Sequence, residues 1–321
     1  MIKKLLFSLL LTSSIITAQS YAPPAGQAGS TAVAKSSSVF IGWATGITVV
    51  RGPQDIANPT GPLASSGNPN DALGGTSTSV VSLGDGGSAT VTFASPIANG
   101  SGFDFAVFEN GFSDTFLELG FVEVSSDGIN FFRFPSHSET QTTTQIGGFG
   151  AVDCRYINNL AGKYRANYGT PFDLSDLPDN ALLDKDNITH VKIIDAIGTI
   201  NPLYASHDSH GNIVNELYST PYATGGFDLN AVGVINIKTL GNNKDFDKNT
   251  VSLYPNPASD IVYINSEEES DVTIYNISGE IVKALPKANH KAITVSDLNS
   301  GIYLFEVTIQ NKKSTTRILV K

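Results

Sequence analysis

The chain has 321 residues, of which 40% are hydrophobic and 16% charged, a composition typical of a globular protein with room for two domains. Thirty acidic against 20 basic side chains give a net charge of −10, which argues against nucleic acids and anionic membranes as partners. Cys154 is the single cysteine, so an intrachain disulfide and a multi-cysteine metal site are excluded.

Residues 1–18 have the three-part layout of a secretory signal peptide. Lys3 and Lys4 form a basic start, residues 5–16 are mainly apolar, and small residues end the segment at Ala18. The alternative is a buried N-terminal strand. No later apolar run is long enough to span a bilayer, so the sequence predicts a protein without a membrane span, exported through the periplasm and either secreted or held on the outer cell surface.

Residues 19–240 are predicted to form one all-β domain. Short runs rich in β-branched and aromatic residues alternate with polar, glycine-containing stretches, and no segment has a helical period. The expected strands are 79–83, 89–93, 103–109, 117–124, 131–134, 190–195 and 227–235. About 220 residues are enough for one β-sandwich core, and the rest must lie in long loops, where function usually resides.

Three sequence segments of this region are similar to segments of the galactose-binding-like, or discoidin-like, jelly roll. Residues 122–131 resemble its central hairpin, 226–232 its closing strand and 70–74 its early loop, which holds a structural calcium ion in many members. A narrower likeness over most of residues 45–236 is to bacterial surface proteins with various sorting tails. The resemblance implies a jelly-roll β-sandwich. Some distant relatives are linked to corrinoid uptake.

Five oxygen-bearing residues on loops or strand ends are candidate calcium ligands: Asn70, Asp71, Asp104, Glu109 and Asp228. Calcium takes six to eight oxygen ligands, so backbone carbonyls are expected to complete the set. The resemblance favours the 70–71 loop as its centre. The alternative is that Asp71 and Asp228 are turn or capping residues and that Asp104 is solvated.

A ligand surface is predicted from aromatic and basic residues in the loop-rich parts: Trp43, Tyr164, Arg165, Tyr168 and Tyr204. Aromatic faces stack on sugar rings or flat apolar ligands, and a guanidinium orients an anionic or amide group. The alternative is that each tyrosine packs a long loop onto the sandwich.

Enzymatic signatures are weak. No nucleophile elbow, zinc-protease helix or phosphate-binding loop occurs. Glu109 with Glu118 or Glu123 is a candidate glycosidase pair. His207 and His210 are the one close histidine pair and a candidate metal site; the alternative is that both are solvated on an exposed loop.

The chain changes character near residue 240. Residues 241–250 are polar without hydrophobic period and are predicted to be a linker. From residue 251 to 321 short alternating strands follow one another, with turn residues every 8–12 positions, which predicts a small Ig-like β-sandwich. The negative charge belongs to the larger part, because residues 248–321 hold eight basic and eight acidic groups.

Residues 251–321 resemble the type A C-terminal sorting domain of the type IX secretion system of Bacteroidetes. The likeness rests on Tyr-Pro-Asn-Pro at 254–257, on residues 275–280, on Asp-Leu-Asn-Ser-Gly-Ile-Tyr at 297–303 and on a basic final strand. It implies that the type IX machinery recognises this domain, and the residues proposed to carry the signal are Pro255, Asn256, Pro257, Gly301 and Tyr303. The alternative is that residues 251–321 form an Ig-like stalk domain without a sorting function.

Together these features predict a secreted or surface-bound, non-enzymatic protein that binds a glycan or another small extracellular ligand, with calcium as structural support. Two alternatives remain: a polysaccharide hydrolase, and a protein that captures a nutrient such as a corrinoid for an outer-membrane transporter.

Overall fold

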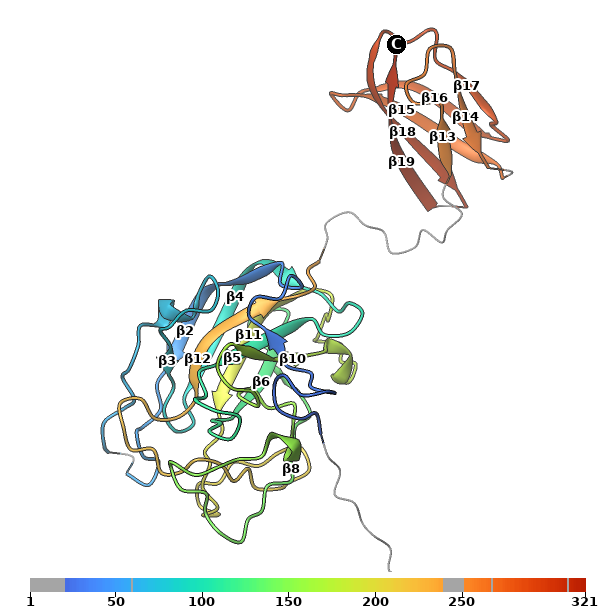
Figure 1. The fold of residues 1–321 in the computed structure, drawn as a ribbon. Helices are drawn as coiled ribbons and strands as arrows, with labels where there is room; N and C mark the ends of the chain where they lie inside the picture. Colours follow the sequence, from blue (N-terminus) through green and yellow to red (C-terminus); the bar gives the residue numbers. More distant parts are fainter. Residues whose placement is uncertain (1–20, 59, 239–250, 267, 311) are drawn as a thin grey trace, which may run out of the picture. The chain divides into compact units, whose positions relative to one another are not determined.

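The computed structural model describes residues 21–58, 60–238, 251–266, 268–310 and 312–321. The chain divides into two compact units, Met1–Thr239 and Leu240–Lys321, which are described separately (Figure 1). The predicted signal peptide, residues 1–18, and the predicted linker, residues 241–250, lie outside the described residues.

The N-terminal unit is built from strands and three short 3₁₀ turns. The strands are β1 (Val33–Ala34), β2 (Gly42–Val50), β3 (Val81–Ser82), β4 (Ser88–Ile97), β5 (Phe105–Glu109), β6 (Gly120–Ser125), β7 (Phe132–Arg133), β8 (His137–Ser138), β9 (Ile157–Asn158), β10 (Tyr168–Phe172), β11 (Ile188–Asp195) and β12 (Asp228–Val234). The turns are η1 (Pro69–Ala72), η2 (Cys154–Tyr156) and η3 (Leu174–Asp176). Among the described residues, no helix has the length and apolarity needed to cross a membrane.

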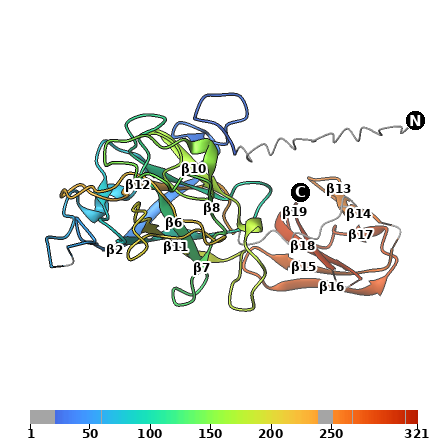
Figure 2. The ribbon, with the colours of Figure 1, turned by 90° about the horizontal axis from the view of Figure 1, so that it is seen from below.

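One antiparallel sheet curls over to make the sandwich, in the order β1-β10-β5-β12-β2-β4-β11-β6-β7, with β3 paired to β12. β2 joins the two halves, because Gly42 and Trp43 pair with β12 whereas the strand from Ala44 onward pairs with β4. The halves therefore face each other (Figures 1 and 2). The predicted all-β jelly-roll sandwich is confirmed.

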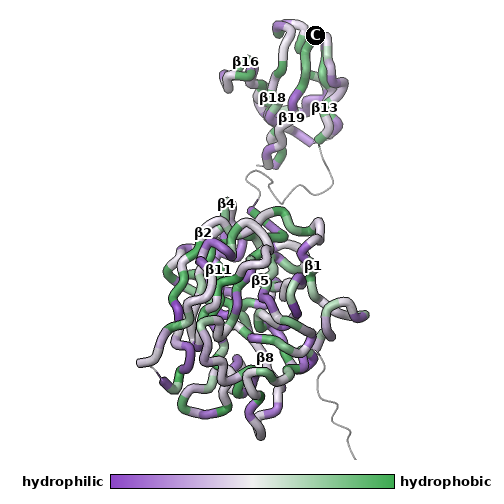
Figure 3. Tube along the Cα trace, turned by 60° about the vertical axis from the view of Figure 1, so that its left-hand side comes forward, coloured by the Kyte–Doolittle hydropathy of each residue, from purple (hydrophilic) through white to green (hydrophobic). Residues whose placement is uncertain are grey.

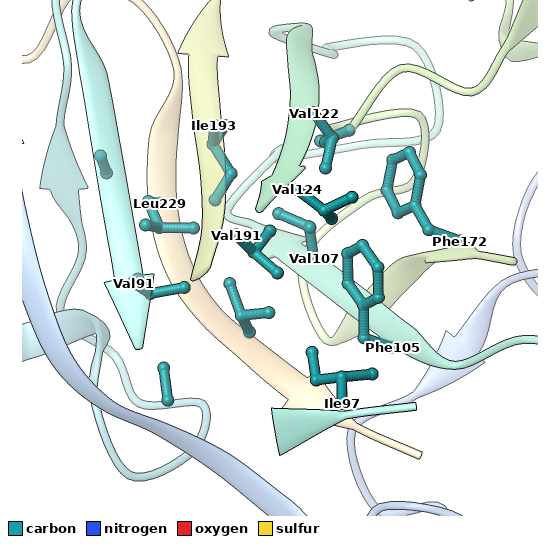
Figure 4. Packing of buried hydrophobic residues seen from close by; sticks show 14 of the residues in the cluster. Val91, Ile97, Phe105, Val107, Val122, Val124, Phe172, Val191, Ile193 and Leu229 are labelled. Carbon is teal, nitrogen blue, oxygen red and sulfur yellow. The ribbon is translucent and has the colours of Figure 1, made fainter. Parts of the chain in front are cut away.

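The main core lies between the halves and follows the period-two alternation of the strands. Phe105 and Val107 of β5 and Leu229 of β12 meet Val191 of β11 and Val124 of β6 (Figure 4). All five are buried, since alternate side chains of a strand point to the same face of the sheet. Because the alternation continues to the ends of the strands, it also determines which residues there point into the core.

Long loops gather at the end of the unit that carries β8, which pairs only with β9 (Figure 1). A second apolar cluster anchors these loops. It contains Leu117, Leu119, Phe121, Val152, Cys154, Ile157, Leu160, Ala196, Val214 and Leu217. The loops are therefore held by their own buried side chains.

The C-terminal unit is a smaller sandwich of seven strands in the described residues: β13 (Ser252–Tyr254), β14 (Ile261–Asn265), β15 (Ser270–Asn276), β16 (Ile281–Ala288), β17 (Ala292–Thr294), β18 (Gly301–Ile309) and β19 (Lys312–Val320). A sheet in the order β13-β14-β17 faces one in the order β16-β15-β18-β19. Hydrophobic and hydrophilic residues alternate along these strands (Figure 3). Their inward rows, such as Tyr303, Phe305 and Val307, fill one core.

Candidate functional site

A pocket of about 540 Å³ opens among the long loops of the N-terminal unit. Strand β8 and the residues after it form one wall, and the segment 212–213 forms the other. The lining residues are His137, Ser138, Glu139, Thr140, Thr142, Asn212 and Ile213. Six of these seven carry polar side chains, so the pocket is suited to a hydrophilic ligand.

Asp208 holds the two walls together. Its carboxylate accepts hydrogen bonds from the backbone N–H groups of Ser138 (2.7 Å), His210 (2.8 Å) and Asn212 (2.8 Å), and from the side-chain amide of Asn212 (3.0 Å). A buried carboxylate with this many donors is stabilised by them in its charged form. Asp208 therefore positions the pocket and has little capacity left to act on a ligand.

Two histidines and a tyrosine lie at one side of the pocket. The rings of His137 and His210 are 4.3 Å apart between centroids, and Tyr21 Oη lies 2.5 Å from Nδ1 of His137. Burial raises the pKa of Tyr21, and the charges of Glu139 and Asp208 raise it further. The tyrosine therefore stays protonated and able to donate to His137 at neutral pH.

Glu139 supplies the one acidic side chain that lines the pocket. Its Oε2 is buried and has no hydrogen-bond partner among the described residues, while its backbone N–H donates to the carbonyl of Tyr156. Buried polar atoms nearly always have a partner. A turn of this side chain toward the pocket would let a bound hydroxyl or amine supply that partner.

None of the five predicted ligand-binding residues lines this pocket. Tyr164 is only 1% exposed and its hydroxyl bonds to that of Thr31 at 2.8 Å, so it packs the N-terminal segment. Trp43 is half-buried between Phe40 and Phe108, on the face of β2 opposite the main core. The packing alternative, which concerned the tyrosines, describes Tyr164, and Trp43 packs on strand β2.

Arg165 and Tyr168, which follow Tyr164 in the chain, contact each other. Arg165 pairs with Asp114 at 2.8 Å, and its guanidinium sits 4.7 Å from the centre of the Tyr168 ring. Tyr204 is half-buried, and its backbone N–H donates to the carbonyl of Asn201. These contacts are made within the protein, and none of the three residues lines the pocket beside β8.

The five predicted calcium ligands are not brought together. Asp71 is the third residue of a capping box on η1, accepting from the backbone N–H of Asn68 at 2.9 Å, and Asn70 is exposed beside it. Asp104 accepts from the backbone of Gly100 and Leu174 and from Asn236. It therefore serves as a structural acceptor at the start of β5, about 16 Å from Glu109 at the strand's other end.

Glu109 and Asp228 lie on the neighbouring antiparallel strands β5 and β12, but Glu109 is paired to Leu229, so the adjacent Asp228 points to the other face of the sheet, beside Asn110. They belong to a group of five buried carboxylates that we call the acidic cluster: Glu109, Glu118, Asp195, Glu216 and Asp228. Within the described ranges, however, no three His, Cys, Asp or Glu side chains are arranged as ligands of one metal ion.

The pKa values of the acidic cluster are all raised, and burial is the largest cause at every member. The pKa of Asp195 rises to about 7 and that of Asp228 to about 6, whereas those of the three glutamates lie well above their usual value. Each glutamate also feels the negative charge of its neighbours, so the carboxylates repel one another.

Glu123, the other residue considered for a glycosidase pair, is separate from this cluster. It lies on β6 and pairs with Arg133 at 2.8 Å and more weakly with Lys192 at 3.9 Å. His207, which was paired with His210 in the sequence, forms a backbone bridge with Ile213. His210 instead faces His137.

In the C-terminal unit, the side chain of Asn256 forms hydrogen bonds with the backbone of β19, as a neighbouring strand would. Its side chain donates to the carbonyl of Arg317 and accepts from the N–H of Leu319, both at 2.9 Å. The flanking Pro255 and Pro257 are exposed. Gly301 begins β18, and Tyr303 is buried in the core with its hydroxyl bonded to the carbonyl of Asn299.

Sequence reasoning missed the pocket, and it missed Asp195 of the acidic cluster, as functional candidates. His137 and Glu139 are far in the chain from Asn212, and no local pattern joins them. The sequence did indicate that Asp195 points into the core, because it continues the inward row Val191, Ile193 at a position where a hydrophobic residue is expected.

Comparison with solved structures finds β-glucuronidases from Ruminococcus gnavus. The complex with uronic deoxynojirimycin matches at 10% identity with a TM-score of 0.22, covering 87% of this chain and 44% of that one. The complex with D-glucuronic acid has a TM-score of 0.23, covering 87% and 45%. The chain thus spans less than half their length, and TM-scores this low show no shared overall fold. No curated protein matches.

Residues 252–321 match the family described as "Secretion system C-terminal sorting domain". The match covers the whole C-terminal sandwich, from β13 to the last residue. The C-terminal unit of this chain is therefore a type IX secretion sorting domain, and the protein is exported by that system to the cell surface or the extracellular space.

Proposed function

We propose that the N-terminal unit is a non-enzymatic binding domain and that it takes a neutral saccharide in the pocket beside β8. The observation that carries this proposal is the polar lining of the pocket, in which Glu139 has a carboxylate oxygen without a hydrogen-bond partner among the described residues. Sugar hydroxyls both donate and accept hydrogen bonds, so a lining of hydroxyl, amide, imidazole and carboxylate groups suits them.

The charge of the unit favours a neutral ligand over an anionic one. Residues 19–247 carry 22 acidic and 10 basic groups, and the pocket lining contains a carboxylate but no lysine or arginine. An anionic sugar would meet this negative potential without a compensating cation. The polar lining also suits a saccharide better than a corrinoid, which presents a broad ring with apolar flanks.

Binding is favoured over hydrolysis because the pocket offers a single available carboxylate. Glycoside hydrolysis generally uses two carboxyl groups placed on either side of the scissile bond. The nearest second acid, Asp208, has both oxygens occupied by hydrogen bonds that hold the walls. Glu139 is thus suited to accept a hydrogen bond from a sugar.

The test is a glycan array with the purified mature chain, followed by calorimetric titration of the best saccharide. Glu139→Gln is expected to weaken binding about tenfold or more, because the lost bond is made to a charged acceptor. Thr142→Ala, at the exposed rim, is expected to have a smaller effect.

Glu123→Gln, which neutralises a carboxylate outside the pocket, serves as the matched control and should bind as the parent does. Absence of any saccharide ligand, or unchanged affinity in Glu139→Gln, would contradict the proposal. Release of reducing ends from a bound polysaccharide would instead identify a hydrolase.

A further inference from the structure

The two walls of the pocket beside β8 continue beyond it as neighbouring segments. The backbone N–H of Asn215 donates to Oγ1 of Thr140 at 3.3 Å, and its side-chain oxygen accepts from the N–H of Ile146 at 3.1 Å. Further along, the N–H of Tyr218 donates to the carbonyl of Ile146 at 3.1 Å. The two segments therefore run side by side, in the same direction, away from the pocket.

Each segment leads into a turn that carries an aromatic side chain. In the first, the N–H of Gly150 donates to the carbonyl of Gly147 at 2.7 Å, which places Phe149 at the tip of a tight turn. In the second, the N–H of Gly225 donates to the carbonyl of Tyr222 at 2.9 Å. Backbone hydrogen bonds therefore hold both aromatic residues in place, although neither lies on a strand.

The sequence leaves Phe149 uncovered, because both of its chain neighbours are glycines. Gly148 approaches the second segment so closely that an added Cβ would lie 2.4 Å from the carbonyl oxygen of Ser219. At Gly150 an added Cβ would lie 2.6 Å from Cγ2 of Ile146. The close packing thus requires glycine at both positions, and neither neighbour has a side chain that could shield the ring.

Phe149 and Tyr222 form an exposed pair of rings, which we call the aromatic pair. Their ring centroids are 6.5 Å apart and the ring planes are inclined by 48°, so neither ring covers the face of the other. Phe149 is 82% exposed and Tyr222 is 51% exposed. Aromatic surface in contact with water is unfavourable, so a ligand that covered these faces would gain free energy from its removal from water.

The size of the aromatic pair suits a small ring better than a protein. Given the exposed fractions of the two residues, the rings offer roughly 200–350 Å² for contact, since an aromatic side chain buries about 150–250 Å² in all. A stable protein complex buries about 800 Å² on each partner. The pair is therefore too small to be a protein interface by itself, whereas one or two sugar rings would cover it.

We propose that the aromatic pair is a stacking site for a neutral saccharide, and that it holds further units of the chain that occupies the pocket. The inference rests on the proposed function of the pocket and specifies the ligand as an oligosaccharide or polysaccharide. The CH face of a sugar ring stacks on Phe149, and the hydroxyl of Tyr222 can bond to a sugar hydroxyl. From Thr142, on the pocket wall, to Phe149 the chain spans at most about 25 Å, which several linked sugar units can bridge.

The experiment is a calorimetric titration of neutral oligosaccharides into the mature chain, using series built from glucose, mannose, galactose or xylose with one to about eight units. Affinity is expected to rise with chain length until the ligand reaches both sites. Phe149→Ala should weaken binding of the long members about tenfold, because a stacked ring is lost, and should leave a monosaccharide unaffected. Tyr222→Ala should have a smaller effect of about threefold, because this ring is already half covered.

Two further variants separate stacking from a general disturbance of the surface. Phe149→Trp keeps an aromatic face and should therefore bind as the parent does. Its fluorescence should shift to shorter wavelength with a long oligosaccharide but not with a monosaccharide, whereas the parent, whose single tryptophan is the half-buried Trp43, supplies the baseline. Tyr254→Ala removes a ring of the sorting domain that is 52% exposed and contacts Tyr263, and as the matched control it should bind like the parent.

The outcomes distinguish this inference from the proposed function. Unchanged affinity of Phe149→Ala for long oligosaccharides would overturn the stacking site, and weaker binding by Glu139→Gln in the same experiment would leave the pocket as the binding site. Weaker binding by Phe149→Ala but not by Glu139→Gln would support the stacking site and contradict the role of the pocket. A parent chain that binds no member of any series would overturn both.

Discussion

The two sandwiches of this chain are built on the same alternation but end their inward rows differently. In the sorting domain the rows are apolar throughout, as in Tyr303, Phe305 and Val307 of β18. In the N-terminal unit the rows of β5 and β11 end in Glu109 and Asp195. Burying a carboxylate costs free energy, so its presence at a core position indicates a role other than stability. The sorting domain is recognised by the type IX secretion machinery, whereas the role proposed for the N-terminal unit is to bind a ligand.

The largest difference between the two units is expected in how their loss affects export. A chain lacking residues 252–321 should remain in the periplasm, because it has lost the sorting domain. The N-terminal unit should nevertheless fold, since it forms a compact unit with its own core. Cell fractionation with immunoblotting measures the first expectation, and circular dichroism of the periplasmic product measures the second. Export of the truncated chain at the normal level would contradict the division of roles.

The next effect is a difference in pH dependence, measured in EDTA so that stray metal ions do not contribute. The N-terminal unit should lose stability as the pH rises from about 4 to 8, because the pKa of Asp228 is raised to about 6 and that of Asp195 to about 7. Raised carboxyl pKa values mean that the folded state binds more protons than the unfolded state, so deprotonation favours unfolding.

Melts of the full chain at several pH values measure this difference. The sorting domain contains no group of this kind among its described residues, and its melting temperature should change less over the same range. An N-terminal unit that becomes steadily more stable up to pH 8 in EDTA would show that the cluster is not under repulsion.

A smaller effect is expected in the sorting domain from Asn256→Ala. The substitution removes two hydrogen bonds to β19, and the free energy of unfolding of this unit should fall by about 1–2 kcal/mol. Asn265→Ala, at an exposed position of β14, is the matched control and should change it by less. Urea unfolding measures both variants. Equal stability of the two would mean that Asn256 contributes nothing through these bonds.

The sequence allowed much of the fold to be predicted, because the strands of both units alternate clearly. It also marked the Tyr-Pro-Asn-Pro segment, and the structure adds how Asn256 bonds to β19. The reason is physical: alternation and turn residues are local signals that survive without tertiary information. The same alternation, followed one residue further, would have identified Asp195 as an inward carboxylate.

The candidate sites were predicted less completely. Glu109 and Asp228 were both chosen as calcium ligands. They lie on neighbouring strands, but the pairing of Glu109 with Leu229 turns Asp228 to the other face of the sheet, while Asp104 is held at the far end of β5. The pocket was not predicted. Its two walls are joined by Asp208 through bonds to backbone N–H groups of Ser138 and Asn212, and a contact of that kind leaves no periodic trace in the sequence.

The most direct test of the difference between the two units is differential scanning calorimetry of the intact mature chain at pH 5 and at pH 8. The account predicts two transitions, of which the N-terminal one moves down by several degrees at pH 8 while that of the sorting domain changes less. In Glu109→Gln, which removes one of the buried carboxylates, the downward shift should be smaller. An N-terminal transition that does not move down at pH 8 in the parent chain would contradict the account.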